Sequence, residues 1–269
     1  GLVGSEMCIR DSGMTMFKLT LAMLTLAMLT ACSDNTNKPA QTDGATPASK
    51  TLRIATEGAY PPFNDLAADG TLVGFDVDVM NAICAKMAVQ CELVAQDWDG
   101  ILPGLLSNKY DAVIAGMSIT DERQQQVDFS SPYFKNTIVW MTKDGGKFNP
   151  SAIQNNVLGG QRSTTGGAYI QEHYDGKEGN RVQLYDSYVN AYLDLKSGRN
   201  DAVMAEKVSA KDWLKNNTGF VLVGEEIDNN DNIAIAVRKG DPLKAQFDNA
   251  LAELKASGEL AQIEAKHFQ

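Results

Sequence analysis

The sequence predicts an α/β protein built from two lobes of similar construction. From Thr51 onward, short β-rich runs alternate with helical patterns, which is typical of sheets that contain parallel strands. A similar phrase occurs twice, as LLSNKYDAVI at 105–114 and as LKSGRNDAVM at 195–204. Each phrase ends a helix, turns, and opens a buried strand with Asp-Ala-Val. Because ligands bind at the carboxyl ends of such strands and between domains, we expect a site between the lobes.

The first half begins with a strand at 52–55 and a helix at 75–87, whose apolar residues recur at steps of three and four. It continues with strands at 92–94, 112–114 and 137–141 and helices at 99–108 and 121–126. Pro103 falls in the first turns of its helix, and Thr120 is the expected N-cap of the next one.

The second half repeats the alternation. Its expected strands are 157–158, 182–184, 202–204, 220–223 and 233–237, and its expected helices are 168–174, 187–196, 208–216, 241–256 and 259–266. Gly198 follows one of these helices, and Gly258 separates the last two. The alternation supports one α/β lobe in each half of the chain.

The N-terminal segment is typical of an export signal. Residues 1–13 show no periodicity, and we expect them to be non-native. Lys18 precedes an apolar run at 19–29 that is too short to span a membrane. The ending Leu-Thr-Ala-Cys at 29–32 resembles the bacterial lipoprotein box. That resemblance implies cleavage before Cys32 and a lipid on its sulfur; the alternative is an ordinary signal peptide with a chance cysteine.

A polar segment follows the proposed lipid site. Residues 32–50 contain almost only small and polar side chains after Cys32, so they cannot bury enough apolar surface to fold. We therefore expect 1–31 to be a leader and signal peptide and 32–50 a lipid-anchored tether. The protein is expected to be exported, in the periplasm or at the cell surface, and attached to a membrane through Cys32.

Charge and cysteine content narrow the function. The chain has 34 acidic and 24 basic residues and a net charge of -10, which argues against a nucleic-acid partner and is compatible with a cationic ligand. Cys84 and Cys91 form an even pair in an oxidising compartment, and a bridge between them would contribute about 2–3 kcal/mol. A zinc site is disfavoured because no histidine lies near these two thiols.

Motifs of common enzymes are missing from the sequence after the signal. It contains no Gly-x-Ser-x-Gly, no candidate Cys–His pair and no phosphate-binding loop. We expect no catalytic residue, metal site or cofactor. His173 and His267 are expected on the surface, Asp97 and Asp99 as caps of the next helix, and Trp213 in lobe packing.

Several motifs together match one known family. They are EGAYPPF at 57–63, GFDVD at 74–78, DAVIAGMSIT at 111–120, Arg123 with its glutamine run, STT at 163–165 and SGRNDA at 197–202. The chain from about Thr51 to Phe268 resembles the periplasmic polar-amino-acid-binding proteins of ABC importers, especially the lysine/arginine/ornithine and histidine binders. The cysteine spacing is similar to the disulfide of the basic-amino-acid branch.

The resemblance implies a two-lobed, periplasmic-binding-protein-like fold of type II, with a mostly parallel sheet flanked by helices in each lobe. Lobe 1 would comprise 51–137 and 232–269, and lobe 2 would comprise 138–231. The two crossings, near 137–142 and 226–233, would form the hinge.

The family's site provides partners for the two charged groups of an amino-acid backbone. Arg123 would bind the carboxylate as a bidentate fork, with backbone N–H groups of Ser118 and Thr165 completing the cradle. Glu206, with the Ser118 hydroxyl, would take the α-ammonium. The alternatives are a solvated helix arginine at 123 and, at 206, an acid that only favours the next helix dipole.

The remaining site positions concern the ligand side chain. Glu57 would bind a distal cation, and Tyr60 and Trp98 would sandwich the side chain; a surface acid and ordinary packing are the alternatives. Gly116 belongs to the site but, like Ala115, stands where the histidine and lysine binders carry serine.

A glycine also replaces the family's glutamine, at Gly166. These small residues are expected to enlarge the pocket, which favours arginine over lysine or ornithine, and these over histidine.

The function expected from these residues is capture of a free L-amino acid by a monomer whose lobes close, followed by delivery to a membrane permease. A dehydratase acting on cyclohexadienyl substrates or arogenate, on the same fold, is one alternative. A sensor that reports to a membrane receptor is the other.

Overall fold

The computed structural model describes residues 51–268. The predicted leader at 1–31 and tether at 32–50, with Cys32, lie outside the described residues. The strands are β1 (Thr51–Thr56), β2 (Ala59–Tyr60), β3 (Asn64–Leu66), β4 (Leu72–Val73), β5 (Gln90–Ala95), β6 (Ala112–Val113), β7 (Val127–Phe129), β8 (Phe134–Lys143), β9 (Val157–Gln161), β10 (Arg181–Tyr185), β11 (Ala202–Glu206), β12 (Phe220–Ile233) and β13 (Ala236–Arg238).

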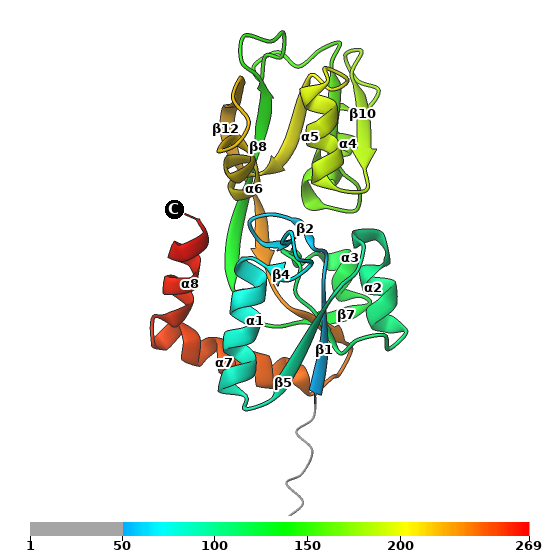
Figure 1. The fold of residues 1–269 in the computed structure, drawn as a ribbon. Helices are drawn as coiled ribbons and strands as arrows, with labels where there is room; N and C mark the ends of the chain where they lie inside the picture. Colours follow the sequence, from blue (N-terminus) through cyan, green and yellow to red (C-terminus); the bar gives the residue numbers. More distant parts are fainter. Residues whose placement is uncertain (1–50, 269) are drawn as a thin grey trace, which may run out of the picture. The chain divides into compact units, whose positions relative to one another are not determined.

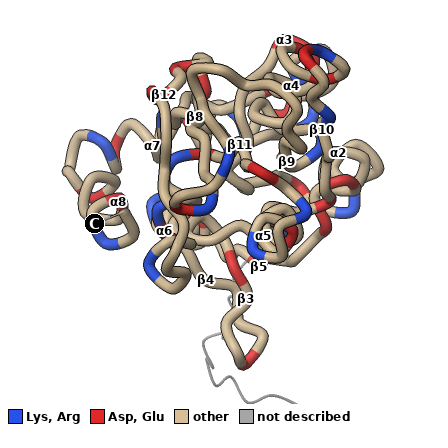
Figure 2. Tube along the Cα trace, turned by 90° about the horizontal axis from the view of Figure 1, so that it is seen from above, with Lys and Arg blue, Asp and Glu red and all other residues tan. Residues whose placement is uncertain are grey.

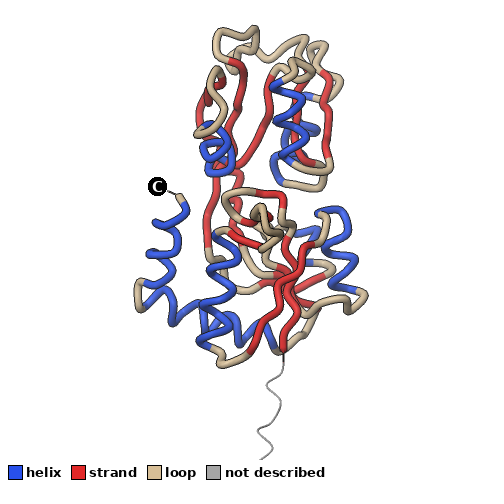
Figure 3. The backbone as a smooth tube through the Cα atoms, viewed as in Figure 1, coloured by secondary structure: helices blue, strands red, loops and turns tan. Residues whose placement is uncertain are grey.

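The helices are α1 (Phe75–Lys86), α2 (Trp98–Leu106), α3 (Asp121–Gln124), α4 (Thr165–Tyr174), α5 (Tyr188–Lys196), α6 (Lys207–Leu214), α7 (Leu243–Ala256) and α8 (Glu259–His267). Strands and helices alternate through most of the described chain (Figure 3).

Two five-stranded sheets form the frame. The first has the order β5-β1-β6-β13-β7 and the second the order β10-β9-β11-β8-β12. Helices α1, α2, α7 and α8 lie around the first sheet, and α4, α5 and α6 around the second (Figure 1). The α/β fold with two lobes is therefore confirmed. The sheets are mixed and not mostly parallel, because β13 and β8 each run antiparallel to both of their neighbours.

Strands β8 and β12 connect the two sheets. They pair antiparallel over most of their length, with register shifts between Val223 and Ile227 and between Ile227 and Asp231. At the end of β12, Ile233 bridges to Ser118, next to the first sheet. These strands are the two crossings of the fold. We propose that they form the hinge and that the lobe boundaries are those predicted from the sequence.

The prediction of a strand limited to 220–223 is wrong, because β12 continues to Ile233. Its middle is polar and largely exposed on both faces, so no alternation of apolar side chains reveals it. Gly224 and Asn230 adopt positive φ angles of 78° and 60°, near the register shifts. Bulges of this kind keep an irregular polar stretch within a ladder.

A third, small sheet of β2, β3 and β4, and strand β7, have no counterpart in the prediction. They contain two or three residues each, too few for a periodic pattern to be detected. The small sheet shapes the chain just after Glu57, so it positions part of the site.

The predicted disulfide is present. Cys84 of α1 is bonded to Cys91 of β5, and their Cα atoms lie 6.2 Å apart. The bridge ties the end of a core helix to the edge of the first sheet. On α1, the buried apolar residues are Phe75, Val77, Val79, Met80, Ile83 and Cys84. Full burial of each large side chain stabilises the fold by about 1.5–3 kcal/mol.

Acidic and basic residues are interspersed over the described elements, as Figure 2 shows. This distribution provides no continuous basic stripe for a nucleic-acid backbone within the described part of the chain. Within residues 51–268, no helix has the length and apolar character needed to cross a membrane.

Candidate functional site

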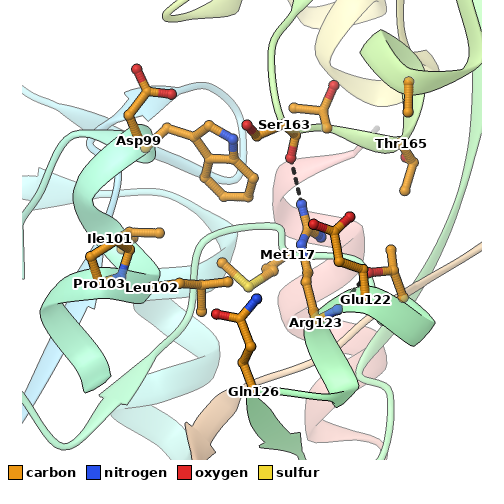
Figure 4. Close-up of a pocket in the computed structure, with 14 residues that line it drawn as sticks. Asp99, Ile101, Leu102, Pro103, Met117, Glu122, Arg123, Gln126, Ser163 and Thr165 are labelled. Carbon is orange, nitrogen blue, oxygen red and sulfur yellow. Dashed lines mark hydrogen bonds between the residues drawn. The ribbon is translucent and has the colours of Figure 1, made fainter. Parts of the chain in front are cut away.

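Most of the predicted ligand-binding residues line one narrow cavity. They are Glu57, Tyr60, Trp98, Gly116, Ser118, Arg123 and Glu206. The last predicted residue, Thr165, lines an adjoining pocket that shares Trp98, Arg123 and Thr164 with the cavity (Figure 4). Residues from the ends of strands in both sheets thus meet in one place, as the two-lobed prediction requires.

Arg123 is held in the cleft by several groups. Its backbone N–H donates to the Thr120 side chain at 3.2 Å, which confirms Thr120 as the N-cap of α3. The guanidinium donates to the carbonyl oxygen of Ser118 at 2.6 Å. It also donates to the carbonyl oxygen of Ser163 at 2.7 Å (Figure 4). It also lies over the Trp98 ring, 5.3 Å from its centroid. The guanidinium is therefore fixed at the junction of the two pockets and is not a freely solvated group.

The first turn of α4 lies opposite Arg123. Thr164 is its N-cap and accepts from the N–H of Gly167 at 3.0 Å. Thr165 is the first helical residue, and Figure 4 shows it near Ser163 and across from Arg123. A helix N-terminus presents free N–H groups and favours an anion. Together with a guanidinium, it provides the chemistry for binding a carboxylate.

Glu206 ends β11 and is 4% exposed. Its Oε2 atom has no hydrogen-bond partner among residues 51–268. Burial, and then the charge of Asp231, raise the pKa of Glu206 to about 7. Although Glu206 stands at the N-cap of α6, its side chain caps no N–H within the described chain. A buried acceptor without a partner is costly, and an ammonium group would satisfy it.

Glu57 follows β1 and is 8% exposed. Burial raises its pKa to about 7. Its Oε1 atom accepts from Nε2 of Gln161 at 2.8 Å, and the same nitrogen donates to the carbonyl of Asp186 at 3.0 Å. Gln161, the last residue of β9, was missed in the sequence. Its position at the carboxyl end of a strand was the signal that could have revealed it.

Aromatic rings fill the side of the cavity near Tyr60. That ring stacks between Phe63, with centroids 5.0 Å apart, and Tyr188, with centroids 5.8 Å apart. Gly116 has φ +55°, and a Cβ there would lie 2.7 Å from the Tyr60 ring. A Cβ on Gly166 would lie 3.0 Å from the Tyr188 hydroxyl. The small residues at these two positions therefore accommodate rings, which corrects the expectation that they enlarge the pocket.

A buried network supports the cavity from behind. Asp76 is fully buried and accepts from the Tyr133 hydroxyl at 2.6 Å and from Nδ2 of Asn64 at 2.8 Å. Oδ1 of Asn64 in turn accepts from the N–H of Gly58 at 2.7 Å, next to Glu57. Burial raises the pKa of Asp76 to about 7. Asp76 belongs to the recognised GFDVD motif, but its supporting role could not be read from the sequence alone.

Predictions for residues outside the ligand site are confirmed only in part. His267 is only partly exposed, because its side chain is 16% exposed and its Nε2 atom lies 2.7 Å from a carboxylate oxygen of Asp78. Asp97 is the N-cap of α2, but its side chain caps no N–H in the described chain. Asp99 does not act as a cap and instead pairs with Arg162 from the other lobe.

Two further predictions are confirmed. His173 lies on the exposed surface of α4. Trp213 packs against Tyr192 and Phe220, within its own lobe.

Comparisons with known proteins identify relatives of this chain. An L-arginine-binding protein of Pseudomonas aeruginosa is 39% identical over 231 residues, covering 82% of this chain and 89% of the relative. ABC transporter arginine-binding protein 1 of Escherichia coli is 35% identical over 232 residues, covering 84% of this chain and 94% of the relative.

A solved structure is also similar. A periplasmic binding protein of Salmonella typhimurium, described as having high arginine specificity, is 36% identical with a TM-score of 0.76. The match covers 82% of this chain and 100% of that one. The family model of the bacterial extracellular solute-binding proteins, family 3, matches residues 52–269. The chain belongs to the bacterial extracellular solute-binding proteins, family 3, and has their two-lobed type II fold.

Proposed function

We propose that the protein captures a free basic L-amino acid outside the cytoplasm and delivers it to the permease of an ABC importer. Arginine is the preferred ligand, followed by lysine or ornithine and then histidine. The observation that carries the proposal is the charge pattern of the cavity, with buried acids at Glu57 and Glu206 and a cation at Arg123. The arginine-binding relatives support the same ligand class.

Each charge of the ligand then has a partner of opposite sign. The guanidinium of Arg123, with backbone N–H groups of Ser118 and Thr165, binds the α-carboxylate. Glu206, with the Ser118 hydroxyl, binds the α-ammonium. Hydrogen bonds between charged partners are the strong ones, and a guanidinium binds a carboxylate in bidentate fashion.

The side chain of the ligand points towards Glu57, which binds the distal cation, with Tyr60 and Trp98 beside it. Burial favours the protonated form of Glu57, and a guanidinium or ammonium next to the carboxylate favours the ionised form again. A neutral side chain would leave this buried acid without a charged partner, so the site selects basic ligands.

Closure of the lobes completes the site. Contacts already join the lobes near the cavity: Nε1 of Trp98 donates to the carbonyl of Arg162 at 3.2 Å, and Arg123 donates to Ser163. A ligand that binds residues of both lobes stabilises the closed state. A shift from mostly open to mostly closed requires about 5.5 kcal/mol of differential affinity, which two charge-assisted clusters are able to supply.

The same proposal makes the protein a binding protein and not an enzyme. Its family and its arginine-binding relatives are solute-binding proteins, so the dehydratase is not favoured. Export with a lipid on Cys32, and a monomeric state, complete the proposal. A sensor function is separable by deleting the partner permease, which abolishes uptake if the protein serves an importer.

Calorimetric titration of the purified protein with arginine, lysine, ornithine, histidine, glutamine and prephenate tests the function. Tight binding of arginine is expected. In an unfolding experiment, arginine at 100 Kd should raise the free energy of unfolding by about 2.7 kcal/mol. Binding of glutamine alone would refute the proposed preference for basic ligands but would support the proposed capture of an amino acid. Turnover of prephenate would establish the dehydratase.

A further inference from the structure

Asp231 is a buried acid beside the proposed carboxylate site. It lies on β12, where this strand crosses between the lobes, and it is 1% exposed. Oδ2 accepts from the Thr165 hydroxyl at 3.3 Å, whereas Oδ1 has no hydrogen-bond partner among residues 51–268. Thr165 is one of the two residues whose backbone N–H groups are proposed to receive the ligand carboxylate. Asp231 therefore contacts the carboxylate end of the site from the hinge.

The charged neighbours of Asp231 come from several elements. Arg123 on α3 is the cation, while Glu206 at the end of β11 and Asp228 on β12 itself are acids. Tyr188 on α5 is a further titratable neighbour. Burial raises the pKa of Asp231, whereas the nearby side chains of Ser118 and Thr165 and the charge of Arg123 lower it. The net direction is upward, so this carboxyl group is prone to take up a proton.

When the ligand is bound, Asp231 is the charged group of the site that has no partner of opposite charge. A basic amino acid carries two cations and one carboxylate. In the proposed complex, Glu57 and Glu206 pair with the cations, and Arg123 pairs with the carboxylate. Asp231 is then a fourth buried charge, next to an incoming anion, and its counter-cation Arg123 is occupied. Burial of an unpaired charge is unfavourable, so the neutral, protonated form of Asp231 has the lower free energy in the complex.

We propose that Asp231 is a positioning residue that acts as the counter-charge of Arg123 in the free protein and takes up one proton when a ligand carboxylate binds there. The inference rests on the proposed capture of a basic amino acid. The proton moves from solvent to a carboxylate oxygen of Asp231, and the hydrogen bond with Thr165 remains available to the neutral group. The hinge strand thus detects whether the carboxylate site is occupied.

The sign of the pH effect separates Asp231 from the other acids. A bound cation lowers the pKa values of Glu57 and Glu206, so their protons are released and affinity rises with pH. A bound carboxylate raises the pKa of Asp231, so a proton is taken up and affinity falls as pH rises. Because the two effects oppose each other, the affinity for arginine has an optimum in pH.

The test compares Asp231→Asn with wild type in the full chain by calorimetric titration with L-arginine, from about pH 5.5 to about pH 8.5. We expect the ratio of the wild-type Kd to the variant Kd to increase with pH, by up to about tenfold per pH unit above the pKa of Asp231. Titrations in two buffers of different ionisation enthalpy should show more proton uptake by wild type than by the variant, by up to about one proton.

Glu225→Gln is the matched control, because Glu225 lies on the same strand but is exposed. It should follow the wild-type profile. A Kd ratio for Asp231→Asn that stays constant over the pH range would overturn the inference, and so would loss of arginine binding at every pH. Asp231→Ser replaces the asparagine variant if that variant does not fold. Absence of arginine binding by wild type would instead refute the proposed function, and the inference with it.

Discussion

Replacing Glu57 with glutamine removes the charge that is proposed to select basic ligands. Glutamine has almost the same shape, and its Oε1 atom is able to accept the hydrogen bond that Gln161 now donates to Glu57. The lobes and the cavity should therefore persist. The change isolates the charge at one end of the site.

The expected loss of arginine affinity follows from the burial of Glu57. Glu57 is 8% exposed, so its interaction with a ligand cation is only weakly screened by water. Loss of one partner of a buried charge pair costs about 2–5 kcal/mol. Part of this cost is offset at neutral pH, because the free carboxyl has a pKa of about 7 and must lose its proton before it binds a cation. We expect arginine affinity to fall by about 2–4 kcal/mol, or about 30- to 1,000-fold.

Titration calorimetry with arginine and with citrulline, its neutral isostere, measures the effect. The substitution should weaken arginine and leave citrulline unchanged or tighter, and it should abolish the rise in arginine affinity with pH that comes from Glu57. The matched control is Glu92→Gln, an acid of the same lobe that is 59% exposed. An equal loss of affinity for arginine and citrulline would refute the proposal that Glu57 binds the distal cation. It would indicate a general distortion of the cavity.

Further predictions concern the other groups. Arg123→Lys keeps the charge but loses the bidentate fork, so the binding free energy of arginine should weaken by about 2–3 kcal/mol while chemical denaturation shows little change. Cys84→Ser opens the disulfide and should lower the free energy of unfolding by about 2–3 kcal/mol in urea titrations. Glu57, Asp76 and Glu206 have pKa values raised to about 7 in the fold, so they bind more protons folded than unfolded. The ligand-free protein should therefore have a lower Tm at pH 8 than at about pH 5.5 by calorimetry, and an equal or higher Tm at pH 8 would contradict their burial as acids.

The fold was largely predictable because long elements carry periodic signals. The buried face of α1 and the paired cysteines were recognised from spacing, and the structure confirms both. Strands of two or three residues and the polar middle of β12 carry no such signal. Their pairing depends on tertiary neighbours, so local pattern could not indicate it.

The meeting of most of the predicted site residues in one cavity was also predictable, through the family motifs that contain them. Residues that modify those groups were not. Gln161 meets Glu57 across 104 positions of sequence, Asp231 meets Thr165 across 66, and Tyr133 meets Asp76 across 57. Only the first of these contacts joins the two lobes, but all three depend on how elements distant in the sequence pack against one another, which a single sequence does not specify residue by residue.

The acids that surround the cavity explain why these distant partners matter. Glu57, Glu206 and Asp231 all have pKa values raised by burial, so the ligand-free fold carries groups that would be more stable in water. Gln161 and Thr165 reduce that cost by donating hydrogen bonds. They do not remove it, because oxygens of Glu206 and Asp231 stay without partners in the described chain. A ligand with two cations satisfies two of these acids at once, so part of its affinity comes from relieving a cost that the empty site already bears.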